Sequence, residues 1–235
     1  MNRRKIMKKR LVSALLFIIG LASAVVFIVF RHSLPLRITV VLKMLPTFMM
    51  ALWLITQKIE KANVMVFVGI LLAMIGDLFM EIPGETFLMI GIVVNTLAII
   101  SFTLYFYFSD RSGDWVRLIP IAIVMGVFYI ILYDYLAELR IPVLVYCIIH
   151  TLFLWRSSAR FGEEHISPLA QYVCFIGCVM VTISDFLLSL TIFGVLPDKP
   201  LYSVADMILW WGGLFMLMIT AEIRRVNIQR KLQQG

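Results

Sequence analysis

The feature that most constrains this chain is a succession of uncharged apolar runs, separated by short charged or turn-forming breaks. A helix of about 20 apolar residues spans the hydrocarbon core of a bilayer. With 62% hydrophobic residues and a mean hydropathy of +0.97, the chain is also more apolar than soluble domains are. We expect an all-α, polytopic membrane bundle that forms a single membrane domain over residues 1–235. Its eight predicted transmembrane helices cover about 11–30, 37–56, 64–81, 86–108, 117–133, 140–155, 168–190 and 202–222.

Two interpretations fit the first run, which follows a strongly basic N-terminus. A basic segment, an apolar stretch and the small residues Ala22-Ser23-Ala24 are typical of a cleaved secretory signal. The uncharged run from Leu11 to Phe30 has the length of a full span, whereas the apolar part of a signal has about 7–15 residues. We therefore interpret it as the first membrane helix.

The basic residues indicate how the bundle is oriented. If the N-terminus is cytosolic, sixteen Lys and Arg residues fall on the cytosolic side and four on the other, and Lys43 lies within a helix. This bias follows the positive-inside rule, so both termini should be cytosolic. The net charge of +7 is then explained by membrane-flanking loops, and we expect no nucleic-acid partner. Trp53, Trp115 and Trp155 lie near the cytosolic helix ends, as interfacial anchor residues do.

Several classes of catalytic site are disfavoured by the sequence. No break between the runs exceeds about a dozen residues, so the loops leave no room for a soluble catalytic domain. Zinc sites need converging ligands, and the three histidines lack the spacing of a zinc motif. The cysteines, Cys147, Cys174 and Cys178, lie inside apolar runs and are interpreted as small buried residues. We expect no metal and no cofactor.

Four ionisable residues interrupt the runs near the non-cytosolic side. In the stretch AMIGDLFM, Asp77 lies about 6–7 Å from the end of its helix. Lys43 lies about 9 Å below the same surface, and Asp185 about 5–10 Å below it. Asp206 is one turn into the last helix. A charge near the centre of a span costs about 2.5–3.5 kcal/mol on insertion scales, and such residues usually face the bundle interior. The sequence therefore predicts a polar pocket at one depth.

Small and polar residues share helix faces with these charges. Gly69, Gly76 and Ala73 adjoin Asp77 at helical spacing, which predicts a narrow face that another helix approaches closely. A similar face in the seventh helix contains Gly177, Cys178, Thr182 and Asp185. In the second helix Lys43 and Thr47 are one turn apart with Pro46 between them, so a carbonyl freed by the proline is expected to line the cavity.

Structural roles remain open for each of these residues. Asp77 and Asp185 also fit structural ion pairs with Lys43. Asp206, close to the interface, fits a snorkelling or capping residue. His150 and Asn95 fit hydrogen bonds between helices.

Two carboxyl groups and a cation, if they act chemically, form a recognisable set. One carboxyl kept protonated can act as a general acid, while the other, ionised, acts as a general base or stabilises positive charge. That set is suited to cleaving an acid-labile C–O bond through an oxocarbenium-like state.

Four blocks resemble the YhhN-like lysoplasmalogenase family in that family's order. They are VLKMLPTFMMAL (41–52), GILLAMIGDLFM (69–80), VYCIIHTLFLWRSSAR (145–160) and GCVMVTISDFLLSLTIFG (177–194). The combination of a lysine near proline, a Gly-Asp pair and a Ser-Asp pair is more specific than any one of them. The resemblance implies an integral membrane enzyme that hydrolyses the vinyl-ether bond of lysoplasmalogens to a fatty aldehyde and a glycerophospho-base. It also implies an endoplasmic-reticulum or related membrane in a eukaryote.

The resemblance implies roles for matching residues. Lys43, Asp77 and Asp185 match the family's polar core and are the catalytic candidates, with lysophospholipid as substrate and membrane lipids around the bundle. Candidates for substrate binding are Thr47, Asn95, Ser184 and Asp206. The family's usual His and Tyr in the fourth helix are absent, and Trp210, Trp211 and Leu214 replace its polar residues in the last helix, which indicates a divergent member.

A function of another class fits the same residues. In a lipid-binding or transport bundle, these charges would bind a head group or relay protons. The weak echo between GDLFM (76–80) and SDFLL (184–188) is of the kind that a parallel internal repeat would leave.

Overall fold

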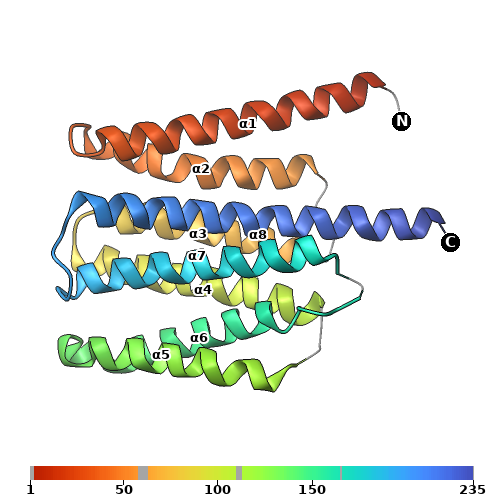
Figure 1. Cartoon of the computed structure of the whole chain (residues 1–235). Helices are drawn as coiled ribbons and strands as arrows, with labels where there is room; N and C mark the ends of the chain where they lie inside the picture. The colour runs from red at the N-terminus through yellow and green to blue at the C-terminus, as the bar shows by residue number, and fades with distance from the viewer. Residues whose placement is uncertain (1–2, 58–62, 110–112, 165, 235) are drawn as a thin grey trace. The chain divides into compact units, whose positions relative to one another are not determined.

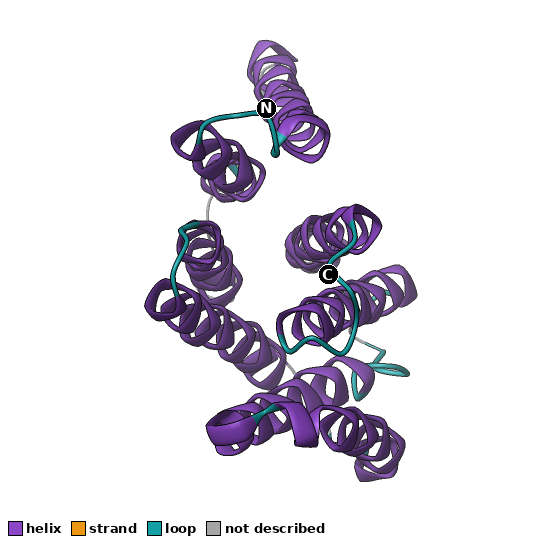
Figure 2. Cartoon of the chain, turned by 90° about the vertical axis from the view of Figure 1, so that its left-hand side faces the viewer, coloured by secondary structure: helices purple, strands orange, loops and turns teal. Residues whose placement is uncertain are grey.

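The computed structural model describes residues 3–57, 63–109, 113–164 and 166–234, with side chains over 7–57, 63–109, 113–164 and 166–223. Over these residues the secondary structure consists of helices and their connections, without strands (Figure 2). The α-helices are α1 (Arg3–Phe30), α2 (Leu36–Thr56), α3 (Val64–Glu81), α4 (Glu85–Ser109), α5 (Leu118–Leu132), α6 (Arg140–Ser158), α7 (Pro168–Ile192) and α8 (Pro200–Gln234) (Figure 1). Short 3-10 helices flank α5 and α6: η2 (Trp115–Arg117), η3 (Tyr133–Tyr135) and η4 (Ala137–Leu139).

Eight helical segments of the described chain are long and apolar enough to cross a membrane, which indicates an integral membrane protein. The predicted all-α class with eight spanning helices is confirmed. Two helices extend beyond their predicted spans, because α1 already begins at Arg3 and α8 continues to Gln234. Charged residues are good helix formers outside the bilayer, so the helix continues where the apolar run stops. The predicted loop cations Lys58, Lys61 and Arg111 lie outside the described residues.

The chain packs as two compact units, Met1–Ser101 and Phe102–Gly235. The boundary falls within α4, so the first part of this helix belongs to unit 1 and its last turns belong to unit 2.

In unit 1, α1 packs on α2, and α2 packs on α3. Pro46 lies inside α2, and a proline has no N–H to bond the carbonyl four residues before it. That carbonyl belongs to Leu42, and it accepts a hydrogen bond of 2.8 Å from the Ser23 hydroxyl of α1. The freed carbonyl was expected to line a cavity. Instead, it joins two helices.

In unit 2, α7 and α8 pack closely along their length, and α6 contacts both α5 and α7. Small residues permit this approach: a Cβ atom added at Gly213 of α8 would lie 2.8 Å from the backbone oxygen of Gly177 on α7.

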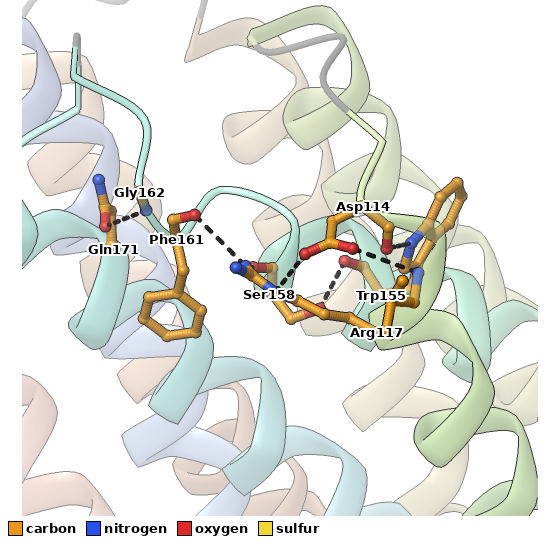
Figure 3. A network of polar contacts seen from close by, with 8 residues as sticks. Asp114, Arg117, Trp155, Ser158, Phe161, Gly162 and Gln171 are labelled. Atoms are coloured by element: carbon orange, nitrogen blue, oxygen red, sulfur yellow. Dashed lines mark hydrogen bonds and ion pairs between the residues drawn. The ribbon is translucent and has the colours of Figure 1, made fainter.

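A polar network fastens the end of α6 to the loops beside it (Figure 3). Arg117 pairs with Asp114 at 2.8 Å and donates to the carbonyl oxygen of Ser158, one of the carbonyls at the end of α6 that lack a helical partner. The indole nitrogen of Trp155 donates to the carbonyl oxygen of Asp114 at 2.9 Å. In the loop after α6, the backbone N–H of Gly162 donates a hydrogen bond to the side-chain oxygen of Gln171 (Figure 3).

The tryptophans predicted as interfacial anchors differ from one another. Trp115 is 66% exposed, as an anchor should be. Trp53 and Trp155 are buried, so the prediction that they belong to an exposed belt is wrong. Trp53 packs against Phe17 of α1, with ring centroids 5.6 Å apart, and Trp155 belongs to the network of Figure 3.

Candidate functional site

Among the residues that the structure describes, each unit contains a cluster of polar side chains inside its spans. The unit 1 cluster consists of Lys43, Thr47, Asp77, Glu81 and Asn95. The unit 2 cluster consists of Tyr146, His150, Thr182, Ser184, Asp185 and Asp206.

An ion pair lies at one end of the unit 1 cluster. The ammonium of Lys43 is 3.0 Å from Oε2 of Glu81; Lys43 is buried, and 11% of the Glu81 side chain is exposed. The sequence left open an ion pair between Lys43 and Asp77, and the structure places Glu81 as an ion-pair partner of Lys43. Glu81 was missed because it lies at the very end of its apolar run. Its spacing of four from Asp77, one turn further along the same face, was the available signal.

Asp77 is 3% exposed and lies on the face of α3 predicted to be buried. The hydroxyl of Thr47 on α2 is 3.4 Å from Oδ2 of Asp77, which is a long hydrogen bond. The side chain of Asn95 on α4 packs directly on Gly76, the residue before Asp77. Oδ1 of Asn95 is buried and has no hydrogen-bond partner among the described residues. A buried amide oxygen left in this way can accept a bond from a ligand or a water molecule.

Asp185, at the centre of the unit 2 cluster, lies beside an imidazole. Its Oδ2 atom is 3.1 Å from Nε2 of His150 on α6, at ion-pair distance although not aligned as a hydrogen bond. The other ring nitrogen, Nδ1, is 3.2 Å from the hydroxyl oxygen of Thr182. Tyr146, one turn before His150, interacts with Asp185 as well.

The sequence predicted that His150 makes a hydrogen bond between helices, and its contact with Thr182 confirms this. It did not predict the pairing of His150 with Asp185. A histidine near the middle of a span, where a charge is costly, was the signal that pointed to an acidic partner.

Ser184 and Asp206 bond to one another at the start of α8. The Ser184 hydroxyl lies 2.5 Å from Oδ1 and 3.0 Å from the backbone oxygen of Asp206. Asp206 is buried, so the prediction that it snorkels to the interface is wrong. Its bond with Ser184 joins α7 to α8 inside the span.

The predicted small and polar faces of α3 and α7 are confirmed by burial. On α3 the buried residues include Gly69, Ala73, Gly76 and Asp77, and on α7 they include Gly177, Cys178, Thr182 and Asp185. Among the side chains that the structure describes, no group of three His, Cys, Asp or Glu residues is placed to hold a metal ion. The unit 1 cluster offers carboxyl, ammonium, hydroxyl and amide groups, and the unit 2 cluster offers carboxyl, imidazole, phenol and hydroxyl groups.

Comparison with known proteins tests the family resemblance of the sequence blocks that contain these residues. A search of curated proteins and a search of solved structures each found no match. The model of the YhhN family matches residues 38–221, which are most of the chain and include every residue of the two clusters. The chain therefore belongs to the YhhN family.

Proposed function

We propose that this protein is a membrane lipid hydrolase that cleaves the vinyl-ether bond of lysoplasmalogens. The products would be a fatty aldehyde and glycerophospho-ethanolamine or glycerophospho-choline. Membership of the YhhN family supports a hydrolase of this kind. We propose that both termini are cytosolic and, in a eukaryotic cell, that the endoplasmic reticulum or a related membrane holds the protein.

One observation carries the proposal: the environment of Asp185. This carboxyl is 5% exposed inside a spanning helix, and its contacts among the described residues are with His150 and Tyr146. A lysine or arginine partner would hold a carboxylate permanently ionised, whereas an imidazole and a phenol both exchange protons. Asp185 is therefore suited to hold and release a proton in an apolar setting.

The reaction begins with transfer of that proton. Asp185 protonates the vinyl carbon that is not bonded to oxygen, and the π electrons of the double bond form the new C–H bond. The resulting cation is stabilised by the ether oxygen as an oxocarbenium ion. General acid catalysis of this kind contributes about 10²–10⁴-fold to a rate.

Water then attacks the cation. The sequence resemblance, and not the packing of the two units, makes Asp77 the candidate general base, which takes a proton from this water as its oxygen bonds to carbon. As the hemiacetal collapses to the aldehyde, its C–O bond to glycerol breaks, the glycerol oxygen takes the proton held by Asp77, and the hemiacetal hydroxyl proton returns to Asp185. One water molecule is consumed, and both carboxyl groups regain their starting states. The amide oxygen of Asn95, which has a free acceptor site, is the proposed contact for a substrate hydroxyl or for the water.

We propose that the remaining candidate residues either position the catalytic groups or bind the head group of the lipid. We propose that the Lys43 ammonium attracts the lipid phosphate, as a point charge suits that anion, with Glu81 as its partner when no substrate is bound. Thr47 orients Asp77 through their hydrogen bond. Ser184 and Asp206 hold the ends of α7 and α8 together beside the substrate.

The direct test uses purified protein in liposomes with lysoplasmenyl-ethanolamine, and its ester analogue as the control substrate. We expect mass spectrometry to detect aldehyde from the vinyl ether alone. In D₂O, with the aldehyde trapped at once by borohydride, the product should contain one deuterium on the carbon next to the former aldehyde carbon, because the acid protonates carbon. Binding of the lipid without any aldehyde would instead favour the lipid-binding or transport function.

Two substitutions test the assignment of the acid and the base. Asp77→Asn and Asp185→Asn should each abolish aldehyde release while the protein still inserts in the membrane. Asp198→Asn is the matched control, because Asp198 is exposed between α7 and α8. Full activity in either buried variant would remove that residue from the mechanism.

A further inference from the structure

The hydroxyl of Thr182 determines which nitrogen of His150 bears a proton. It donates its one hydrogen to the backbone oxygen of Cys178, four residues earlier, at 2.9 Å. Toward Nδ1 of His150, 3.2 Å away, it therefore presents a lone pair. A contact at this distance is favourable when Nδ1 bears a hydrogen. This tautomer follows from the hydrogen-bond network of unit 2.

The opposite nitrogen then constrains Asp185. Nε2 of His150 is 3.1 Å from Oδ2 of Asp185. If neither atom bore a proton, an electron-rich ring nitrogen and a carboxylate oxygen would lie 3.1 Å apart and would repel one another. One proton therefore belongs to the pair, either on the imidazole, with an ionised carboxylate, or on the carboxyl group, with a neutral imidazole. Both forms have zero net charge, which lowers the cost of burial in a span.

Aromatic and ionisable groups of α6 and α8 surround the pair of His150 and Asp185. On α6, the Tyr146 ring packs against the His150 ring at a tilt, with centroids 4.4 Å apart, and Cys147 follows Tyr146 in the chain. On α8, Asp206 acts electrostatically on Tyr146. His150 itself is fully buried, and the ring of Phe153 packs edge-on against it at 6.1 Å. With no exposed edge, the ring keeps its orientation, and the proton that it shares is sheltered from bulk water.

We infer that His150 is a positioning residue that, oriented by Thr182, shares one transferable proton with Asp185 and supplies it to that acid. The inference rests on the proposed function, in which Asp185 protonates the substrate. Once Asp185 has transferred the proton, the pair is left with one proton fewer and a net negative charge, and it regains a proton when the hemiacetal collapses. Tyr146 and Asp206 remain neighbours throughout.

The sharing of one proton between His150 and Asp185 has a measurable consequence. A proton with two alternative sites binds more tightly than a proton with either site alone, so removal of His150 can only make the proton easier to lose. We expect His150→Gln to move the alkaline limb of the rate–pH profile to lower pH by about one unit or more. At neutral pH, kcat should fall by about tenfold or more with little change in KM. A loss of kcat with an unmoved profile would overturn the inference in favour of a purely structural role.

Thr182 and His32 provide matched controls. Thr182→Val removes the acceptor for Nδ1 and should move the profile in the same direction but less far, whereas Thr182→Ser keeps the hydroxyl and should restore the original profile. His32→Gln alters an exposed histidine and should change nothing. A Thr182→Ser variant that behaved like Thr182→Val would contradict the orienting role of the hydroxyl.

A second experiment is independent of activity. The chain has three histidines, so ¹⁵N-histidine NMR of the full-length protein in nanodiscs, with His150→Gln to assign the signal, reports the tautomer directly. We expect Nδ1 of His150 to remain protonated throughout the titration. A neutral ring with its hydrogen on Nε2 alone would overturn the inference. If the wild-type protein released no aldehyde, the proposed function would fail, and this measurement would still decide the protonation of the pair.

Discussion

The two polar clusters differ in the kind of partner that their helices provide. In unit 1 the buried cation, Lys43, faces Glu81, so a permanent positive charge meets a carboxylate. In unit 2 the partner of Asp185 is an imidazole, which can either hold or release a proton. The comparison teaches that similar Asp-containing segments acquire different chemistry from their neighbours: unit 1 holds a fixed charge, and unit 2 holds a mobile proton.

The largest expected effect is on kcat/KM, and double-variant cycles show which residues of each cluster act together. Asp185→Asn should lower kcat/KM by about 10²–10⁴-fold, and adding His150→Gln should lower it little further, because the pair acts as one unit. Asp77→Asn and Lys43→Met should instead have multiplicative effects, because Lys43 has Glu81 as its ion-pair partner. Aldehyde release by the single and double variants measures both cycles. Strong coupling between Asp77 and Lys43 would erase the distinction between the clusters.

The next effect concerns the ion pair of unit 1. Lys43→Met alone or Glu81→Leu alone should destabilise the protein by about 3–5 kcal/mol, because each leaves one charge buried without its partner. The double variant should recover most of that stability, which thermal unfolding in detergent measures. Its KM for the lysolipid should remain raised, since the proposed phosphate contact is lost. Recovery of both stability and KM would reduce Lys43 to a purely structural residue.

The sequence predicts the helices well and the partners poorly. Spans such as that of α3 can be predicted because apolar length is a property of one segment. Faces can be predicted too, since helical spacing places Gly76 and Asp77 beside one another on a buried surface. The pairing of His150 with Asp185 depends on how α6 is rotated against α7, and no single segment encodes that rotation.

The role of Pro46 shows the same limit. Its missing N–H could be predicted from the residue alone. That Ser23 of α1 would bond the freed Leu42 carbonyl depends on how the two helices pack, which no single segment encodes.

The smallest expected effects are those of replacing one glycine in each unit with alanine, and they differ because the nearest neighbour of each glycine differs. At Gly213 an added Cβ would lie 2.6 Å from a methyl group of Val181 and 2.8 Å from the backbone of Gly177, so α7 and α8 must separate. Gly213→Ala should therefore lower stability by about 1–3 kcal/mol. At Gly76 the added Cβ meets the Asn95 amide, an end group that can rotate away. Gly76→Ala should cost less stability but lower aldehyde release, because it moves Asn95 from its place beside Asp77.

The control is Gly126→Ala in α5, where nothing lies within 4 Å of the added atom. A glycine in the middle of a helix is less favourable than alanine by about 0.5–1 kcal/mol, so this variant should be slightly more stable than the wild type. Thermal unfolding and aldehyde release of the three variants give a pattern that packing alone does not produce: stability lost in unit 2, activity lost in unit 1, and neither lost at Gly126. If Gly76→Ala lost stability in proportion to activity, Asn95 would be a packing residue, and the proposed contact of its amide oxygen with the substrate would be refuted.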